Sequence, residues 1–154
     1  MMTYLKISAL FAILLFSSIA KAQNLFPEKF KECDTERFLL ESDTANAGID
    51  EEEFKEIVLS ALKEKDLNRI RGEIAFQIIV DLHGNSCLIS MENGTNVKSK
   101  KMDIKAAIDS DLKCDPPTQQ VAAIVKLEFR EHIIRLTRLG LNGKRGWHEL
   151  SSDL

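Results

Sequence analysis

The side chains of this chain that could carry out chemistry are three histidines, His83, His132 and His148, and three cysteines. The histidines are too far apart to match the short spacings of metal-binding motifs, and no nucleophile motif accompanies them. Asp81 and His83 flank a turn and could form an acid–base or metal pair, but such a pair needs a third ligand or a nucleophile nearby. The sequence offers none. We therefore expect ordinary turn residues and a non-catalytic protein without a metal or a cofactor.

The first 22 residues, MMTYLKISALFAILLFSSIAKA, have the features of a secretory signal peptide. Lys6 precedes an apolar run that extends from Ile7 to about Ile19 and ends in the small-x-small pattern AKA. This run is shorter than the roughly 20 residues that span a bilayer. We predict cleavage after Ala22, a location in the periplasm or outside the cell, and no stable membrane insertion after cleavage. An uncleaved signal anchor is the alternative.

Residues 23–154 are enough for one domain with a modest core. Without Lys6 and Lys21 the chain has 19 basic and 24 acidic residues, a net charge of −5. This sign argues against nucleic acid and against anionic lipid as the main partner. We divide the chain into a signal peptide (1–22), a helical or irregular lead-in (23–49), an α+β domain (50–140) and a partly ordered tail (141–154).

Two segments are predicted to be amphipathic helices. The first lies in IDEEEFKEIVLSALKEKDL, where Asp50 and Glu53 form a capping box. Apolar residues then recur at helical spacing, namely Phe54, Ile57, Val58, Ala61 and Leu62. The second, MDIKAAIDSDLKC, is capped by Asp103. Its inward-facing residues are Ile104, Ala107, Ile108 and Leu112. A shorter helix is expected in the lead-in at residues 34–41.

Residues 72–93, GEIAFQIIVDLHGNSCLISMEN, have the period-two pattern of a β-hairpin. A two-residue turn at Gly84 and Asn85 would place Leu82 opposite Cys87. The apolar side of the first strand comprises Ile74, Phe76, Ile78, Val80 and Leu82. The other side of the hairpin is expected to meet water or a partner and carries Gln77, Asp81, Ser86 and Ser90.

The segment VAAIVKLEFREHIIRL is predicted to form a third strand. One side of this strand is apolar and comprises Val121, Ala123, Val125, Leu127 and Phe129, and its other side includes the charged residues Lys126, Glu128 and Arg130. The apolar phase then slips to Ile134 and Leu136, which indicates a bulge or a bend near residues 130–133. The order of elements predicts an α+β fold, a three-stranded antiparallel sheet of order 2-1-3 with two helices on one face. The other face would be open, and strand 121–130 would be a free edge.

An oxidising compartment permits a disulfide, and the predicted topology brings Cys87 and Cys114 together. The strand after Cys87 would descend about 17 Å at ~3.3 Å per residue, and the helix from residue 103 to 113 would return about 16 Å at ~1.5 Å per residue. We therefore predict a Cys87–Cys114 disulfide, with Cys33 as the odd, buried thiol. A Cys33–Cys114 pairing is the alternative.

The order of these elements and several short motifs resemble the carboxyl-terminal domain of the TonB family, particularly its Bacteroidetes versions. That family has a glycine before the first strand, a V-D-x-x-G turn, a helix that ends in a proline-containing segment, and a closing strand that ends in phenylalanine. The matching residues are Gly72, Val80 to Gly84, Pro116 with Pro117, and Phe129. The segment LFPEKFKEC is similar to the lead-in of those proteins. The resemblance covers residues 25–136 and implies the TonB-like α+β fold.

The resemblance also implies a binding mode, because the family adds an extended peptide to its third strand, a sheet edge. The matching strand is 121–130, with Lys126, Glu128 and Arg130 as partner-binding residues. The chain has no Pro-rich arm, and its signal peptide is expected to be removed, so force transmission is not expected. Instead we expect a free module that binds a periplasmic or outer-membrane protein or an extended peptide.

Two alternatives remain open. A small secreted protein of net negative charge is also typical of an inhibitor or immunity protein that blocks a partner enzyme. Its contacts would then involve acidic loops and the tail around Trp147. Alternatively, this tail covers the edge of strand 121–130 and makes that edge structural.

Overall fold

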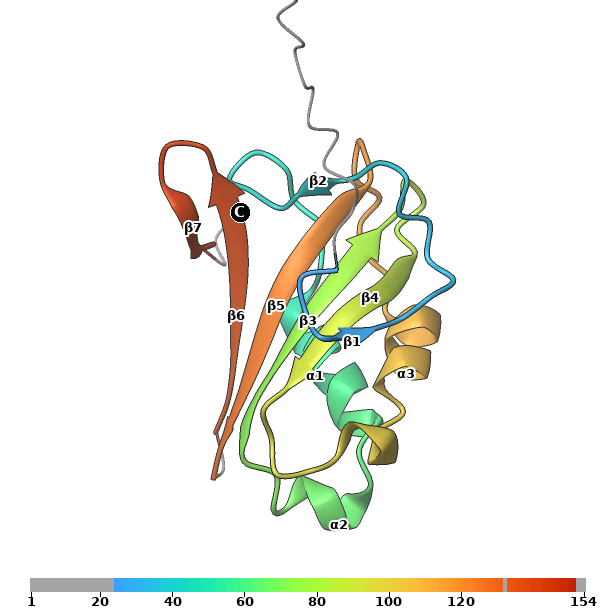
Figure 1. Ribbon diagram of the computed structural model, residues 1–154, viewed down its shortest axis with the longest axis vertical. Coiled ribbons are helices and arrows are strands. Elements are labelled where there is room, and N and C mark those ends of the chain that lie inside the picture. Colours follow the sequence, from blue (N-terminus) through green and yellow to red (C-terminus); the bar gives the residue numbers. More distant parts are fainter. Residues whose placement is uncertain (1–23, 132, 152–154) are drawn as a thin grey trace, which may run out of the picture.

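The computed structural model describes residues 24–131 and 133–151. The predicted signal peptide lies outside these residues. The described chain forms one seven-stranded sheet of order β1-β4-β3-β5-β6-β7, with β2 paired to the start of β5 (Figure 1). The strands are β1 (Glu28–Lys29), β2 (Leu39–Leu40), β3 (Gly72–Val80), β4 (Ser86–Asn93), β5 (Val121–Arg130), β6 (Ile133–Asn142) and β7 (Gly146–Glu149). The helices are α1 (Glu51–Ser60), α2 (Glu64–Leu67), α3 (Ile104–Asp111) and a 3₁₀ turn, Ser99–Lys101.

The α+β class is confirmed, but the predicted three-stranded sheet with two helices is wrong. The described residues contain seven strands and three α-helices. The three predicted strands are β3, β4 and β5, and they lie in the centre of the sheet in the order β4-β3-β5. The lead-in adds β1 and β2, and the C-terminal segment adds β6 and β7. Every pairing is antiparallel except that of β2 with β5.

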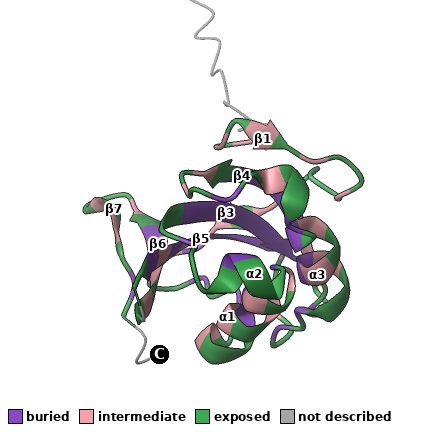
Figure 2. Cartoon of the chain, turned by 90° about the horizontal axis from the view of Figure 1, so that it is seen from below, coloured by how far each residue is buried: buried purple, intermediate pink, exposed green. Residues whose placement is uncertain are grey.

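All three helices lie on one side of the sheet (Figure 2). Helix α1 begins as predicted, because the Asp50 carboxylate accepts the Glu53 N–H at 2.8 Å. Its residues Phe54 and Val58 are fully buried, and the Phe54 ring meets Phe76 of β3 edge to face, with 5.3 Å between centroids. The predicted apolar side of β3 is in this core except for Leu82, which lies beyond the strand and is 55% exposed.

The register of the β3–β4 hairpin differs from the prediction. Val80 pairs with Ser86, and the turn comprises residues 81–85. The Asp81 carboxylate organises this turn by accepting the N–H groups of His83 and Asn85, at 2.8 and 2.9 Å. Gly84 is required there, because its φ is +79° and a Cβ would lie 2.1 Å from the Cys114 carbonyl oxygen. The register also turns Ser86 toward the helices, where its single O–H lies between two acceptors at the end of α3, the carbonyl oxygens of Ile108 at 2.6 Å and Leu112 at 2.9 Å.

The lead-in contains no helix at 34–41 and instead crosses the face of the sheet that was expected to be open. Cys33, Phe38 and Leu40 of the lead-in pack against a small apolar cluster on this face, Ile79, Ile89 and Ala122. The polar side chains Gln77 and Ser90 are also buried here. The Leu25 N–H donates to Gln77 Oε1 at 2.8 Å. The lead-in, which we call the strap, therefore covers the face that was predicted to meet water or a partner.

The disulfide joins Cys33 to Cys87, so both the predicted Cys87–Cys114 bridge and the alternative Cys33–Cys114 bridge are wrong. The reason is the strap. Strand β1 runs antiparallel to β4, with Glu28 opposite Met91 and Lys29 opposite Ser90, and this register carries Cys33 back to Cys87. Cys114 is the free cysteine of the described chain and is buried.

The bend predicted near residues 130–133 is a complete chain reversal. Arg130 pairs with Ile133, so β5 and β6 form a tight hairpin, and Glu131 takes a positive φ of 44° in its turn. Within the segment 141–154, which was expected to be partly ordered, Gly146–Glu149 forms β7 and pairs with the end of β6. Gly140 makes this packing tight, since a Cβ there would lie 2.5 Å from the Leu150 side chain.

The disulfide gives a stability prediction. It closes a loop with a sequence separation of 54 residues, and the chain-entropy relation assigns such a crosslink about 4 kcal/mol. We expect Cys33→Ser to lower the free energy of unfolding by about 2–4 kcal/mol, measured by urea denaturation. Cys114→Ser, which keeps the disulfide, is the control. Peptide mapping under non-reducing conditions should recover Cys33 linked to Cys87, and a Cys87–Cys114 peptide would contradict the fold.

Candidate functional site

Strand β5, the predicted binding edge, lies inside the sheet. It pairs with β3 along one side, and with β2 and β6 along the other. Lys126, Glu128 and Arg130 therefore do not flank an open edge. Their side chains form ion pairs on the sheet surface, Lys126 with Glu73 at 3.1 Å and Arg130 with Glu128. The prediction that strand 121–130 is a free edge is wrong, because the chain that follows it reverses and pairs with it.

Trp147, the other predicted partner-binding residue, lies in β7 opposite Leu141 of β6. Both side chains are partly exposed, Trp147 by 49% and Leu141 by 37%. The tail around Trp147 does not cover β5, since β6 lies between them. The tail covers instead the C-terminal part of β6, which is the upper part in Figure 1, and leaves the outer edge of the N-terminal part of β6 without a partner among the described residues.

The open edge is the lower half of β6. The pairing with β7 covers Leu139 to Asn142, and the last contact is the Leu150 N–H with the Arg138 carbonyl at 2.9 Å. Backbone groups of successive strand residues point to opposite sides, so the N–H and C=O groups of Leu136 and Ile134 point outward like those of Arg138. Among the described residues, no segment pairs with these four groups.

An apolar hollow lies beside the lower end of this edge, on the side of the helices. It lies between the β5–β6 turn and the ends of α1 and α2. Its apolar lining comprises Leu59, Leu67, Ile70, Phe129, Ile133 and Ile134, and the charged residues Arg130 and Glu131 also line it. The hollow encloses about 180 Å³, and Ile133 at its rim is 70% exposed. Ile134 thus combines an outward-pointing backbone with a side chain in the wall of this hollow.

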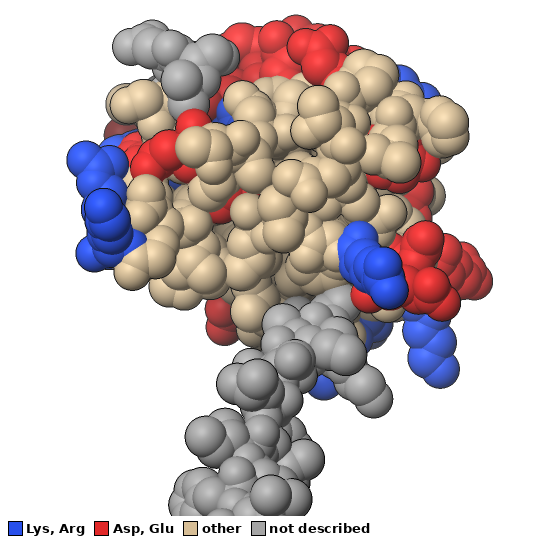
Figure 3. All heavy atoms as spheres, turned by 90° about the horizontal axis from the view of Figure 1, so that it is seen from above, with Lys and Arg blue, Asp and Glu red and all other residues tan. Residues whose placement is uncertain are grey.

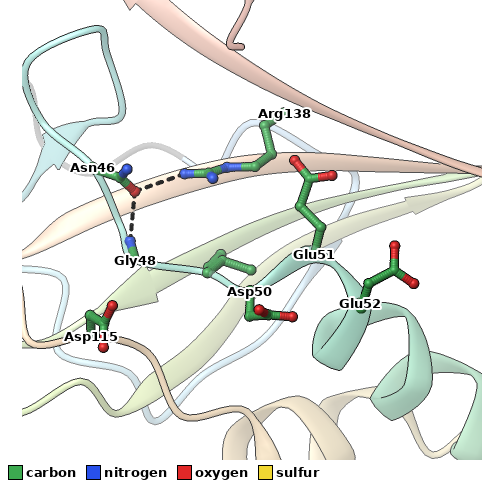
Figure 4. Close-up of a pocket in the computed structure, with 8 residues that line it drawn as sticks. Asn46, Gly48, Asp50, Glu51, Glu52, Asp115 and Arg138 are labelled. Carbon is green, nitrogen blue, oxygen red and sulfur yellow. Dashed lines mark hydrogen bonds between the residues drawn. The ribbon is translucent and has the colours of Figure 1, made fainter. Parts of the chain in front are cut away.

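A second hollow, of about 440 Å³, lies at the upper end of the edge and is acidic (Figure 4). Arg138 of β6 forms one wall, and the first turn of α1 forms the other. Four carboxylates line it, those of Asp50, Glu51, Glu52 and Asp115. The positive charge of Arg138 does not balance them, because its guanidinium group is already engaged by Glu41.

The Glu41–Arg138 ion pair holds the upper hollow together. The Glu41 side chain is fully buried and that of Arg138 is 10% exposed. Glu41 Oε1 also accepts the Ala47 N–H at 2.8 Å, and Arg138 Nη2 donates to Asn46 Oδ1 at 2.9 Å. The loop that leads into α1 is thereby tied to β6. Because the guanidinium is satisfied within the protein, the hollow presents net negative charge to its surroundings.

Both hollows have walls from β6 and α1, and we call the surface between these two elements, from Arg138 and Glu51 to Ile134 and Leu59, the trough. Helix α1 runs from Glu51, near Arg138, to Leu59, near Ile134, so it lies antiparallel to β6. The trough is acidic at its upper end and apolar at its lower end, and the open backbone groups of Ile134 and Leu136 lie along it. Such an arrangement can bind an extended chain, because it offers hydrogen-bonding groups together with side-chain pockets.

Sequence reasoning did not identify the residues of this trough. Glu41 was assigned to a helix, and Arg138 was not considered. The signal that could have located the edge was the slip in apolar phase after residue 130, because Ile134 and Leu136 continue the core face only if the chain reverses. This slip was interpreted as a bend within one strand, and the open edge was therefore placed at β5.

At the far end of the sheet, above β2, the surface is mostly uncharged (Figure 3). A shallow hollow there is lined by Phe38, Leu39, Leu82, Thr118, Gln119 and Gln120, together with the charged residues Asp34, Glu36 and Arg37. Leu39 pairs with the first residue of β5, whereas Ile133 pairs with its last residue, Arg130. Nine residue steps of β5, about 30 Å at ~3.3 Å per residue, separate this surface from the lower end of the trough, and its lining shares no residue with the acidic hollow at the upper end.

His148 and Asp43 hold β7 in place next to the open edge. The two ring nitrogens of His148 face acceptors, Asp43 Oδ1 at 2.9 Å and the Gly146 carbonyl oxygen at 3.1 Å. Only the imidazolium can donate to both. The hydrogen bond to Asp43 is the main cause of a raised pKa of His148, and that same bond lowers the pKa of Asp43, with help from Asn142.

The free thiol of Cys114 is another titratable group of the described chain. Burial raises the pKa of the Cys114 thiol to about 12, which keeps it protonated and unreactive at neutral pH. Within the described ranges, no group of three or more His, Cys, Asp and Glu side chains is placed to hold a metal ion. In the same residues, no helix is long and apolar enough to cross a membrane.

Comparison with protein-family models, with curated proteins and with solved structures finds no match for this chain. The resemblance to the TonB carboxyl-terminal domain therefore stays a prediction.

Amide hydrogen exchange tests the open edge directly. The N–H groups of Arg135 and Thr137 face β5, opposite Glu128 and Lys126, and should exchange slowly. Those of Ile134 and Leu136 face outward and should exchange orders of magnitude faster. Exchange followed by NMR on the oxidised protein would reveal this alternation. Equal protection at all four amides would show that another segment covers the edge.

The His148–Asp43 pair gives a pH prediction. Because the folded state raises the pKa of His148 above its ordinary 6.5, its stabilising contribution is complete below about pH 6.5 and disappears as the pH rises through the raised value. Asp43 acts in the opposite sense, and its contribution is lost as the pH falls through its lowered pKa. An NMR titration of the His148 ring should show a lower pKa in Asp43→Asn, but not in the control Asp111→Asn. An unchanged pKa in Asp43→Asn would refute the pairing.

Proposed function

We propose that this protein is a non-catalytic binding module of the periplasm or the extracellular space. It captures an extended segment of a protein partner by adding it as a strand to β6. The observation that carries this proposal is the row of backbone groups on Ile134 and Leu136 with which no described residue pairs, along a trough with side-chain pockets at both ends. The Cys33–Cys87 disulfide supports an oxidising compartment, since such bonds persist mainly outside the cytosol.

The other edge of the sheet supports β6 as the binding site. The outer side of β4 pairs with β1, and its Leu88 N–H is taken by the Asp109 carboxylate of α3 at 2.7 Å. That edge is thus covered by a strand, a disulfide and a helix side chain, which are common ways to prevent unwanted pairing. The lower part of β6 has no such cover among the described residues.

The energetics favour a ligand that also uses the trough. Four backbone hydrogen bonds, at about 1 kcal/mol each, contribute about 4 kcal/mol. A micromolar complex needs about 8 kcal/mol. Backbone pairing alone is therefore too weak for a specific partner, and the two hollows beside the edge must supply the remainder through side-chain contacts.

A proline at the edge tests the proposal. Leu136→Pro removes an outward N–H but no hydrogen bond to β5, so the sheet should remain folded. Leu136→Ala is the matched control, because it removes the same side chain and keeps the N–H. For peptides selected from a random library on the unmodified protein, the proline variant should bind about tenfold more weakly than the alanine variant, as expected for the loss of about 1.4 kcal/mol. Calorimetry would measure both, and equal affinities would exclude β6 as the site.

A further inference from the structure

We propose that the captured segment carries a basic residue followed, two positions later, by an apolar residue, both on its side facing α1. This inference rests on the proposed addition to β6 and specifies the ligand of that same edge. It follows from the difference in chemistry between the two ends of the trough.

The lower end of the trough selects the apolar residue. A residue paired with Ile134 directs its side chain to the same side of the sheet as Ile134, with Cβ atoms about 5 Å apart. That side is the hollow formed by Leu59, Ile70 and Phe129, among others. Ile134 and Leu59 are only half buried and pack against the main core. A branched apolar side chain of the ligand would extend this core outward.

The upper end selects the basic residue. The ligand residue two positions away points to the same side and pairs with Leu136. On this face of β6, the neighbour of Leu136 is Arg138, which lines the acidic hollow. Glu51 and Glu52, in the first turn of α1, line this hollow together with Arg138. The nearby cations are already engaged, Arg138 by Glu41 and Lys55 by Glu52 at 2.6 Å. A lysine or arginine at this ligand position is therefore attracted by an excess of carboxylates.

The direction of the ligand determines the order of the two residues. Strand β7 occupies the upper part of the same edge and runs antiparallel to β6, and Leu150 makes the last contact with β6 among the described residues. A ligand strand that continues the edge antiparallel to β6 forms the more stable type of ladder. It runs from the acidic end to the apolar end, so its basic residue precedes its apolar residue.

The outer side of the ligand meets different chemistry. Ligand residues between the two anchors point to the opposite face, beside Ile133, Arg135 and Thr137 of β6. The Arg135 side chain is 64% exposed, and its contact with Glu149 is long, at 3.7 Å. This side tolerates polar residues, so the specificity lies on the side that faces α1.

Two peptides of identical composition test the order. The first is acetylated and amidated Ser-Thr-Lys-Thr-Val-Thr-Ser, and the second exchanges its lysine and valine. Each is titrated into the oxidised, ¹⁵N-labelled protein while the amide signals and exchange rates of Ile134 and Leu136 are followed. We expect the first peptide to protect both amides and to bind about fivefold more tightly, a factor within reach of one favourable ion pair.

Charge reversal on α1 provides the second arm. The double variant Glu51→Lys with Glu52→Lys should abolish the preference for the first peptide and favour a peptide with glutamate in place of lysine. Glu56→Lys, an exposed site on α1 outside the acidic hollow, is the control and should keep the original preference. Equal protection by both peptides would overturn the proposed order and leave strand addition standing. No protection by either peptide, or by those selected from a library, would overturn the proposed function as well.

Discussion

The buried ion pair between Glu41 and Arg138 is the interaction on which the relative positions of β6 and α1 depend. Glu41 belongs to the loop that leads into α1, and Arg138 lies in the middle of β6. Removing one partner of a buried pair leaves an uncompensated charge, at a cost of about 3–5 kcal/mol. The pair thus gives the trough a defined width. It also explains why the arginine lies in an acidic hollow without neutralising it.

The two edges of the sheet differ in how far other parts of the chain cover them. At the β4 edge the lead-in contributes a strand and a disulfide, and α3 contributes a carboxylate that accepts the Leu88 N–H. At the β6 edge the last contact among the described residues is that of Leu150, whose side chain packs on Gly140. An uncovered edge normally invites aggregation. Here it is short and carries the charged Arg135, which limits pairing with a second copy.

The strap formed by the lead-in changes what the sheet can expose. Without it, Ile79, Ile89 and Ala122 would form an apolar patch on the second face, beside the polar pair Gln77 and Ser90. With it, that face is closed, and the surface available to a partner shifts toward β6 and α1. The disulfide links the strap to β4 covalently, so the oxidised protein keeps this face covered.

The sequence alone determined the elements whose signals are local. The Asp50 cap, the helical spacing of Phe54 and Val58, and the alternation along β3 all gave correct elements, because each depends on neighbours a few residues away. The tertiary structure decided the rest. Strands β1 and β2 are two residues long and exist because the edges of β4 and β5 pair with them. The β5–β6 reversal occurs at Glu131, and the sequence there has no glycine or asparagine that would indicate a turn. The open edge, the disulfide and the trough all follow from these long-range pairings, which local periodicity does not encode.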